Sequence, residues 1–316
     1  MNLVLVHLNS RLPSHLIANL AYLTRSFPAH QVYLVSDESV ETDQIPLGIE
    51  VIKYESLNID LPSGTDVWNY NSKFRSGFWI TSKVRLLILS KLITSNRMSE
   101  MLHIESDVWL SPNFPFHYFA SIQEDLAFPM ADEKRGVAST LWVKGLAGAQ
   151  LLSKFAERYW SETDMGILGK LAHEGVVKIL PSAFPSDSSD QSGFWFDGAV
   201  IGMHLLGEDP RNRFGLIRRF HKVHGLQPDL RGAHFYFDKT LLTIYRGNTI
   251  EIVSIHNHLK SARIFILKPV RFWIRQLRKR ERRLNYSFSA RALMFAVKEV
   301  NLSALRWCVK RLLNKS

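Results

Sequence analysis

The sequence predicts an α/β fold in which helices flank a mostly parallel sheet, followed by a basic helical extension. Two observations predict the sheet: short apolar runs of strand length alternate with segments whose apolar residues recur at helical spacing, and one such run ends abruptly in acidic residues. A third observation separates the extension, because the excess positive charge lies near the C-terminus. With 46% apolar residues in a chain of 316, a sizeable core can form.

The alternation of strands and helices begins at the N-terminus. Residues 3–8 and 32–35 have the composition of buried strands, and residues 13–27 between them carry apolar side chains at three- and four-residue steps, as in an amphipathic helix. A strand, a helix and a strand follow at residues 48–54, 78–93 and 101–104. Because strands joined through helices lie parallel, we expect a mostly parallel, Rossmann-like sheet.

Two irregular segments interrupt the pattern. Residues 58–77 are polar and aromatic and read as a long loop at the edge where the strands end, and residues 181–192 are rich in serine. Long loops without secondary structure of their own often carry function, so the first segment is expected near a binding site.

Cysteine content and hydropathy limit the class of protein. A single cysteine, Cys308, excludes an intramolecular disulfide and a cysteine-rich zinc site. The N-terminal apolar run is short and has no basic leader or small-residue cleavage site, so we interpret it as the first strand rather than a signal peptide. No stretch reaches the roughly 18 apolar residues of a membrane span. We therefore expect a cytoplasmic protein that does not cross a bilayer.

The net charge of +11 is concentrated in the last part of the chain, where residues 260–316 hold 16 Lys and Arg against two acids. We divide the chain into a domain at residues 1–261 and a basic extension at residues 262–316, in which large apolar residues recur at helical steps. Such helices bind anionic membrane surfaces, with about 1 kcal/mol per Lys or Arg. Alternatively they pack on the core with a solvated basic face. No nucleic-acid-binding motif accompanies the charge, so nucleic acid is not an expected partner.

The strand at residues 101–104 leads directly into Glu105-Ser106-Asp107. Ligands of open α/β sheets bind outside the carboxyl ends of the strands, so these two carboxylates stand where a ligand is expected. Mg²⁺ and Mn²⁺ are typically held by one or two carboxylates together with substrate phosphates. The triplet therefore predicts a metal site, the alternative being a solvated acidic turn.

Two later segments supply further polar groups. Asp197-Gly198 is followed by small residues that allow the backbone to approach a ligand closely. An apolar strand beginning at residue 251 ends in His256, His258 and Lys260, whose side chains point to one side of an extended strand. That side can present an imidazole to a metal and an ammonium to a phosphate. The alternative is that these histidines are structural.

Three more residues are candidates for donor binding. Lys83 and Arg85 in the predicted helix at residues 78–93 can face nucleotide phosphates, although their spacing also fits a solvated helix face. Asp37 follows the second strand, where acids of nucleotide-binding sheets meet the ribose or base, or simply end a turn.

In this order, the motifs resemble those of nucleotide-sugar-dependent glycosyltransferases of the GT-A fold, in particular bacterial enzymes of surface-polysaccharide synthesis, over roughly residues 1–261. The resemblance implies that Glu105 and Asp107 hold Mn²⁺ or Mg²⁺ on the diphosphate of the donor. It implies that His258 joins the metal and that Lys260 meets the diphosphate. The block at Asp197 and Gly198 is similar to the segment that lines the sugar pocket. One departure is that the first acid of the triplet is Glu rather than Asp.

The predicted activity is therefore metal-dependent transfer of a sugar, as by a hexosyltransferase, from a nucleotide-diphosphate donor to a glycan or lipid-linked acceptor. Asp197 is the candidate catalytic carboxylate, either stabilising the oxocarbenium-like carbon or taking the acceptor proton, and hydrogen bonding to sugar hydroxyls is its alternative role. The basic extension would hold the enzyme peripherally on the inner face of the membrane.

Two other functions compete. A non-catalytic membrane-surface adaptor with the same fold is distinguished by whether Asp107 and His258 converge on one ion. A nucleotidyltransferase is expected to have a glycine-rich, basic loop after its first strand, whereas residues 9–13 contain no glycine.

Overall fold

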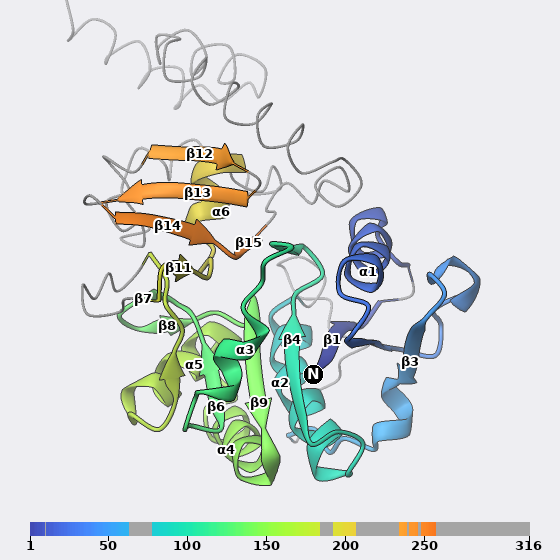
Figure 1. The fold of residues 1–316 in the computed structure, drawn as a ribbon. Coiled ribbons are helices and arrows are strands. Elements are labelled where there is room, and N and C mark those ends of the chain that lie inside the picture. Colours follow the sequence, from blue (N-terminus) through green and yellow to red (C-terminus); the bar gives the residue numbers. More distant parts are fainter. Residues whose placement is uncertain are drawn as a thin grey trace, which may run out of the picture.

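The computed structural model describes residues 1–9, 11–62, 78–183, 192–206, 234–238, 240–245 and 248–256 (Figure 1). Its centre is a seven-stranded sheet with the order β10-β6-β9-β4-β1-β2-β3. Only β9 runs antiparallel to its neighbours, and the other adjacent pairs are parallel. The strands are β1 (Asn2–His7), β2 (Gln31–Ser36), β3 (Ile49–Lys53), β4 (Glu100–Ile104), β6 (Leu126–Phe128), β9 (Thr140–Lys144) and β10 (Lys178–Ile179). The predicted mostly parallel α/β sheet is confirmed.

Helices cover this sheet on both faces. They are α1 (Ser14–Ser26), α2 (Phe78–Thr94), α3 (Phe116–Ala120), α4 (Gly145–Arg158) and α5 (Asp164–His173), with 3₁₀ turns at η1 (Thr42–Gln44) and η2 (Tyr54–Leu57). Alternate residues of β1 show the two layers, since Leu3 and Leu5 join a core with α1, whereas Val4 joins one with α2, α4 and α5. A strand buried on both faces must be apolar throughout, which explains the continuous apolar run in the sequence.

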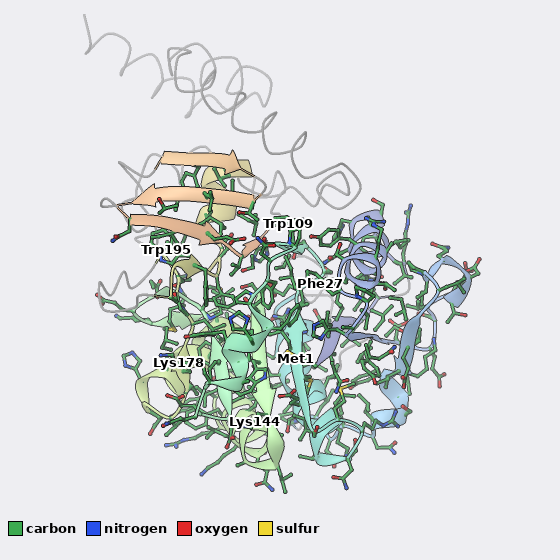
Figure 2. The ribbon with its side chains drawn as sticks, in the orientation of Figure 1. Met1, Phe27, Trp109, Lys144, Lys178 and Trp195 are labelled. Carbon is green, nitrogen blue, oxygen red and sulfur yellow. The ribbon has the colours of Figure 1, made fainter. Side chains whose placement is uncertain are left out.

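A smaller sheet lies beside the central one, in the order β11-β14-β13-β12 (Figure 1). The chain enters it at β11 (Phe194–Trp195), followed by α6 (Val200–Leu206) and by β12 (His234–Asp238), β13 (Thr240–Tyr245) and β14 (Asn248–Ile252). Trp109 and Trp195 (Figure 2) are buried in one apolar cluster that also holds residues of β1, β4, α1 and α6. That shared cluster joins the two sheets.

Two short pairings complete the fold. A hairpin is formed by β7 (Met130–Asp132) and β8 (Arg135–Gly136). The last described strand, β15 (Ser254–His256), pairs antiparallel with β5 (Val108–Leu110), which directly follows the acidic triplet. This second pairing returns the chain from the smaller sheet to the carboxyl end of β4.

The sequence predictions for the first part of the chain are confirmed to within about a residue or two at the element ends. Most of the predicted loop at residues 58–77 lies outside the described residues, as do most of the serine-rich segment and the whole basic extension. Within the described part of the chain, no helix is long and apolar enough to span a membrane.

Candidate metal and donor site

The acidic triplet forms a tight turn at the end of β4. The backbone N–H of Val108 donates to the carbonyl of Glu105 at 3.0 Å. The side-chain amide of Asn19, buried in α1, donates to the carbonyls of Ser106 at 3.1 Å and Val108 at 3.0 Å. Because Asn19 of α1 provides the hydrogen-bond donors for these carbonyls, the backbone of the turn is fixed. The carboxylates of Glu105 and Asp107 face the edge of the sheet.

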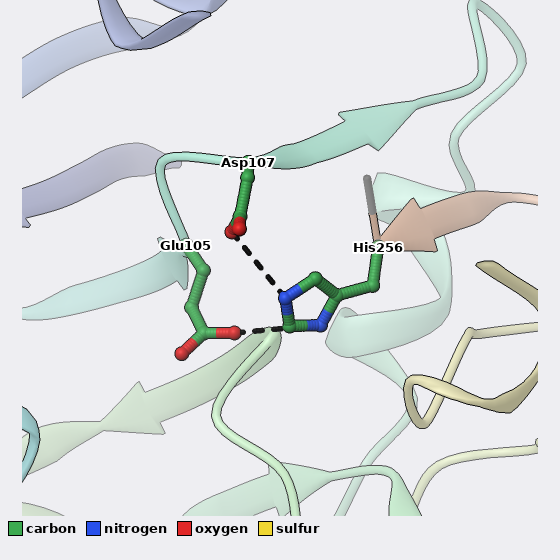
Figure 3. Close-up of side chains that lie close together, drawn as sticks. All are labelled: Glu105, Asp107 and His256. Carbon is green, nitrogen blue, oxygen red and sulfur yellow. Dashed lines mark ion pairs between the residues drawn. The ribbon is translucent and has the colours of Figure 1, made fainter. Parts of the chain in front are cut away.

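His256 completes a three-residue cluster with the two acids (Figure 3). In the antiparallel pairing of β15 with β5, His256 lies opposite Val108, one residue after the triplet. Its Nε2 is 3.4 Å from Asp107 Oδ1, and its Nδ1 is 3.6 Å from Glu105 Oε2. One ligand atom from each of the three residues lies within 4.8 Å of the others. Among the described residues, this is the group of acids and histidines that can hold a metal ion.

The chemistry of the three groups fits a divalent cation. Two carboxylates with an imidazole offer oxygen and nitrogen ligands to Mn²⁺ or Mg²⁺ and leave positions for substrate phosphates. The predicted Glu105 and Asp107 are brought together as expected. His258 and Lys260 lie outside the described residues. Within the described part of the chain, His256 reaches the two carboxylates.

Arg85 stands behind the cluster and binds two acids at once. Its Nη1 donates to Glu105 Oε1 at 2.5 Å, and its Nη2 donates to Asp164 Oδ2 at 2.7 Å. Glu105 thus gives one oxygen to Arg85 and turns the other toward His256. Asp164 is the first residue of α5, and the sequence does not indicate its role. Thr163-Asp164 has the composition of a helix start, but nothing in it indicates a partner 79 residues away.

The electrostatics of the cluster favour the charged forms of His256 and Glu105. Burial lowers the pKa of His256, but the carboxylates of Asp107 and Glu105 raise it by more, to about 9. Burial raises the pKa of Glu105, whereas Arg85 and His256 lower it below its ordinary value. Without metal, an imidazolium therefore lies between two carboxylates. Since the neutral imidazole is the metal-binding form, a divalent cation would take the place of that proton.

Asp197 lies beside the cluster in a different setting. It is fully buried, and its carboxylate accepts backbone hydrogen bonds from Ile201 at 2.9 Å, Gly202 at 2.7 Å and His256 at 2.9 Å. Burial raises its pKa, and these donors lower it only in part. Both oxygens are occupied by backbone groups. This geometry does not favour the direct contact with a sugar that the predicted catalytic role requires, and that role stays a prediction.

Two further predicted donor-binding residues, Lys83 and Gly198, make close packing contacts. The ammonium of Lys83 donates to the carbonyl of Trp160 at 2.5 Å and lies 4.6 Å from the centre of its ring. Gly198 packs so closely that an added Cβ would lie 2.2 Å from the carbonyl oxygen of Met130. The donor-binding roles of Lys83 and Gly198 stay predictions.

Asp37 follows β2 and is buried. Its Oδ1 accepts hydrogen bonds from the backbone N–H of Ser39 at 3.1 Å and from the Ser39 hydroxyl, whereas Oδ2 is buried without a hydrogen-bond partner. Since β2 and β4 flank β1 and all three run parallel, Asp37 lies at the same edge of the sheet as Glu105.

No protein-family model matches the chain, and no curated protein matches its sequence significantly. Among solved structures, the chain is similar to the galactosyltransferase LgtC in complex with donor and acceptor sugar analogues, at 12% identity over 58% of this chain and 74% of LgtC, with a TM-score of 0.39. It is similar to the glycosyltransferase GlyE of Streptococcus pneumoniae TIGR4, at 13% identity over 58% of this chain and 46% of GlyE, with a TM-score of 0.38.

Another similar structure is a putative glucose-1-phosphate thymidylyltransferase from Bacillus anthracis, at 10% identity over 56% of this chain and 85% of that protein, with a TM-score of 0.34. The enzymes that the sequence motifs resemble are therefore among the similar structures. At these low values of identity and TM-score the likeness carries no argument about activity.

Proposed function

We propose that this protein is a metal-dependent glycosyltransferase that moves a hexose from a nucleotide-diphosphate donor to a glycan or lipid-linked acceptor. The observation that carries the proposal is the convergence of Glu105, Asp107 and His256 at the carboxyl end of a parallel sheet. A site with two carboxylates and an imidazole, open to phosphate oxygens, suits a donor whose leaving group is a diphosphate.

In this proposal, Asp107, Glu105 and His256 hold Mn²⁺ or Mg²⁺. When bound, the ion supplies Lewis-acid stabilisation of the negative charge that develops on the leaving diphosphate. Arg85 keeps Glu105 Oε2 directed at the site by occupying Oε1, so less reorganisation is needed on binding. His256 gives up its proton and acts as a neutral ligand.

The reaction forms a bond from the acceptor hydroxyl oxygen to the anomeric carbon and breaks the bond from that carbon to the diphosphate oxygen. The electron pair of the broken bond leaves with the nucleoside diphosphate, and the hydroxyl proton passes to a base. In the proposal, Asp37 meets the nucleoside at the end of β2, and Lys260 balances the charge of the diphosphate.

The acceptor and cellular location are proposed from charge. Residues 260–316 carry 16 Lys and Arg against two acids, which suits the surface of an anionic membrane. A peripheral enzyme on the inner face of a bacterial membrane would meet lipid-linked acceptors of surface-polysaccharide synthesis there. A non-catalytic adaptor would have no need of a convergent metal-binding group, and the glycine-free loop at residues 9–13 disfavours a nucleotidyltransferase.

The test is isothermal titration calorimetry with UDP-, GDP- and CMP-linked sugars, with and without Mn²⁺. We expect one nucleotide class to bind only with the metal, and Asp107→Ala to abolish that binding. The matched control is Asp132→Ala, which removes a carboxylate paired with Arg135 outside the site and should bind like the wild type. Failure of every donor to bind under any metal condition would remove the support for a transferase.

A further inference from the structure

We propose that Asp197 is a positioning residue that sets the place of His256 in the proposed metal site. The inference rests on the proposed function, because it concerns one ligand of the same site. The side chain of Asp197 is closed off from both solvent and substrate. None of its surface is accessible, and both carboxylate oxygens accept hydrogen bonds from backbone N–H groups.

The carboxylate of Asp197 joins two elements that are distant in the sequence. Oδ1 accepts from Ile201 and Oδ2 from Gly202, which are donors in the first turn of α6. The same Oδ2 accepts from the backbone N–H of His256, 59 residues farther along. The position of β15 therefore depends on the start of α6.

Gly202 provides a second, independent constraint on the same residue. A Cβ added at Gly202 would lie 2.0 Å from the carbonyl oxygen of His256 and 2.8 Å from Asp197 Oδ2. The N–H of His256 is held by Asp197, and its carbonyl lies against the backbone of α6. Only glycine allows this approach, so both polar groups of the His256 backbone are defined by the α6 segment.

Asp197 also links His256 to the acidic side of the site. The carbonyl of Ser139 accepts from the backbone N–H of Glu105 at 3.2 Å, and the Ser139 hydroxyl donates to the carbonyl of Asp197 at 3.0 Å. The backbone N–H of Asp197 donates to the hydroxyl of Ser254 at 3.0 Å. A continuous set of hydrogen bonds thus runs from Glu105 through Ser139 and Asp197 to His256, the two ends being proposed metal ligands.

The test measures Mn²⁺ binding to the full chain by the electron paramagnetic resonance signal of free Mn²⁺. Substitution of groups that orient a metal ligand typically weakens metal binding by about 10- to 100-fold. We expect a loss of that size for Asp197→Asn, whose amide can accept fewer of the three N–H groups, and for Gly202→Ala. His256→Ala should weaken binding at least as much.

The matched control for Gly202→Ala is Gly148→Ala. A Cβ at Gly148, in α4, would lie 2.5 Å from the carbonyl oxygen of Asp125, a comparable clash in the segment that follows the far end of β9. The control for Asp197→Asn is Ser90→Ala, which removes a buried hydrogen bond of 2.7 Å to the carbonyl of Ala149. Both controls should bind Mn²⁺ like the wild type.

The decisive comparison places Asp197→Asn in a His256→Ala background. If Asp197 acts through His256, the Asp197→Asn substitution has no further effect on Mn²⁺ affinity once His256 has been replaced by alanine. An equal loss in both backgrounds, or no loss in the wild type, would overturn the inference. If Asp197→Asn fails to fold, the effect of Gly202→Ala on Mn²⁺ affinity is measured in the wild-type and His256→Ala backgrounds instead.

A separate readout distinguishes this inference from the proposed function. If the wild type binds no Mn²⁺, the proposed function fails, and the NMR signals of the His256 ring in the metal-free protein decide about Asp197. Movement of those signals in Asp197→Asn but not in Ser90→Ala supports the positioning role. Unchanged ring signals in both variants would overturn it.

Discussion

Glu105 is one methylene longer than the aspartate expected at the first position of the acidic triplet. The longer side chain has a partner for each carboxylate oxygen. Oε1 accepts a hydrogen bond from Arg85 of α2, and Oε2 faces His256. The sequence indicated Glu105 and Arg85 separately, as a metal ligand and a donor-binding residue. Their pairing could not be predicted, since it depends on how a helix packs on a strand end.

Arg85 is predicted to be essential for stability. Arg85→Met should lower the free energy of unfolding by about 3–5 kcal/mol, because Glu105 and Asp164 would remain buried without their counter-charge. Lys91→Met, on the same helix, should change it by less than about 0.5 kcal/mol. Urea unfolding measures both values, and adding Asp164→Asn should restore part of the loss. Equal stability of the two single variants would contradict a structural role for the ion pairs.

At the scale of elements, α1 supports the strand that follows the triplet. Asn19 fixes the turn, and the Tyr22 hydroxyl donates to the carbonyl of Leu110 at 2.6 Å. The helix itself could be predicted, because its apolar residues recur at helical spacing. Strands of two or three residues such as β10 and β11 could not, since partners far away in the sequence create them. The same holds for the place of His256 beside the triplet, which follows from the pairing of β15 with β5.

The buried hydroxyl of Tyr22 predicts a specific loss of stability at alkaline pH. Burial raises its pKa, so the folded protein keeps the proton where the unfolded chain, with a pKa of about 10, releases it. The unfolded state then binds fewer protons, and the stability contributed by this group is present below about pH 10 and falls as the pH rises above it.

Urea unfolding between pH 8 and pH 11 tests this behaviour against Tyr22→Phe, which has no ionisable group at that position. The wild type should lose stability more steeply than the variant above about pH 10. A difference between the two proteins that stays constant with pH would mean that the hydroxyl of Tyr22 ionises equally in both states.

At the scale of the whole molecule, charge is divided unevenly along the chain. The first strands and helices could be predicted because residues buried on two faces must be apolar. The position of Glu105 and Asp107 at one edge of the sheet could be predicted because it follows from the direction of parallel strands. The basic extension is a sequence prediction alone.

Replacing the five basic residues of the run at 278–283 by glutamine should weaken binding to vesicles containing phosphatidylglycerol by at least about 100-fold, because each contributes about 1 kcal/mol near an anionic surface. The control makes the same change at five exposed positions of the described part of the chain, namely Arg25, Arg97, Lys134, Lys154 and Lys170. Co-sedimentation measures both. Equal binding by the two variants would indicate that the charge in this run is not the membrane contact.

The most direct test of the proposed metal site is a calorimetric titration of Mn²⁺ into the protein with UDP, GDP or CMP present, comparing the wild type with His256→Ala. The convergence of Glu105, Asp107 and His256 predicts that His256→Ala weakens Mn²⁺ binding by about 10- to 100-fold. Wild-type Mn²⁺ affinity in His256→Ala would contradict the site described for this protein.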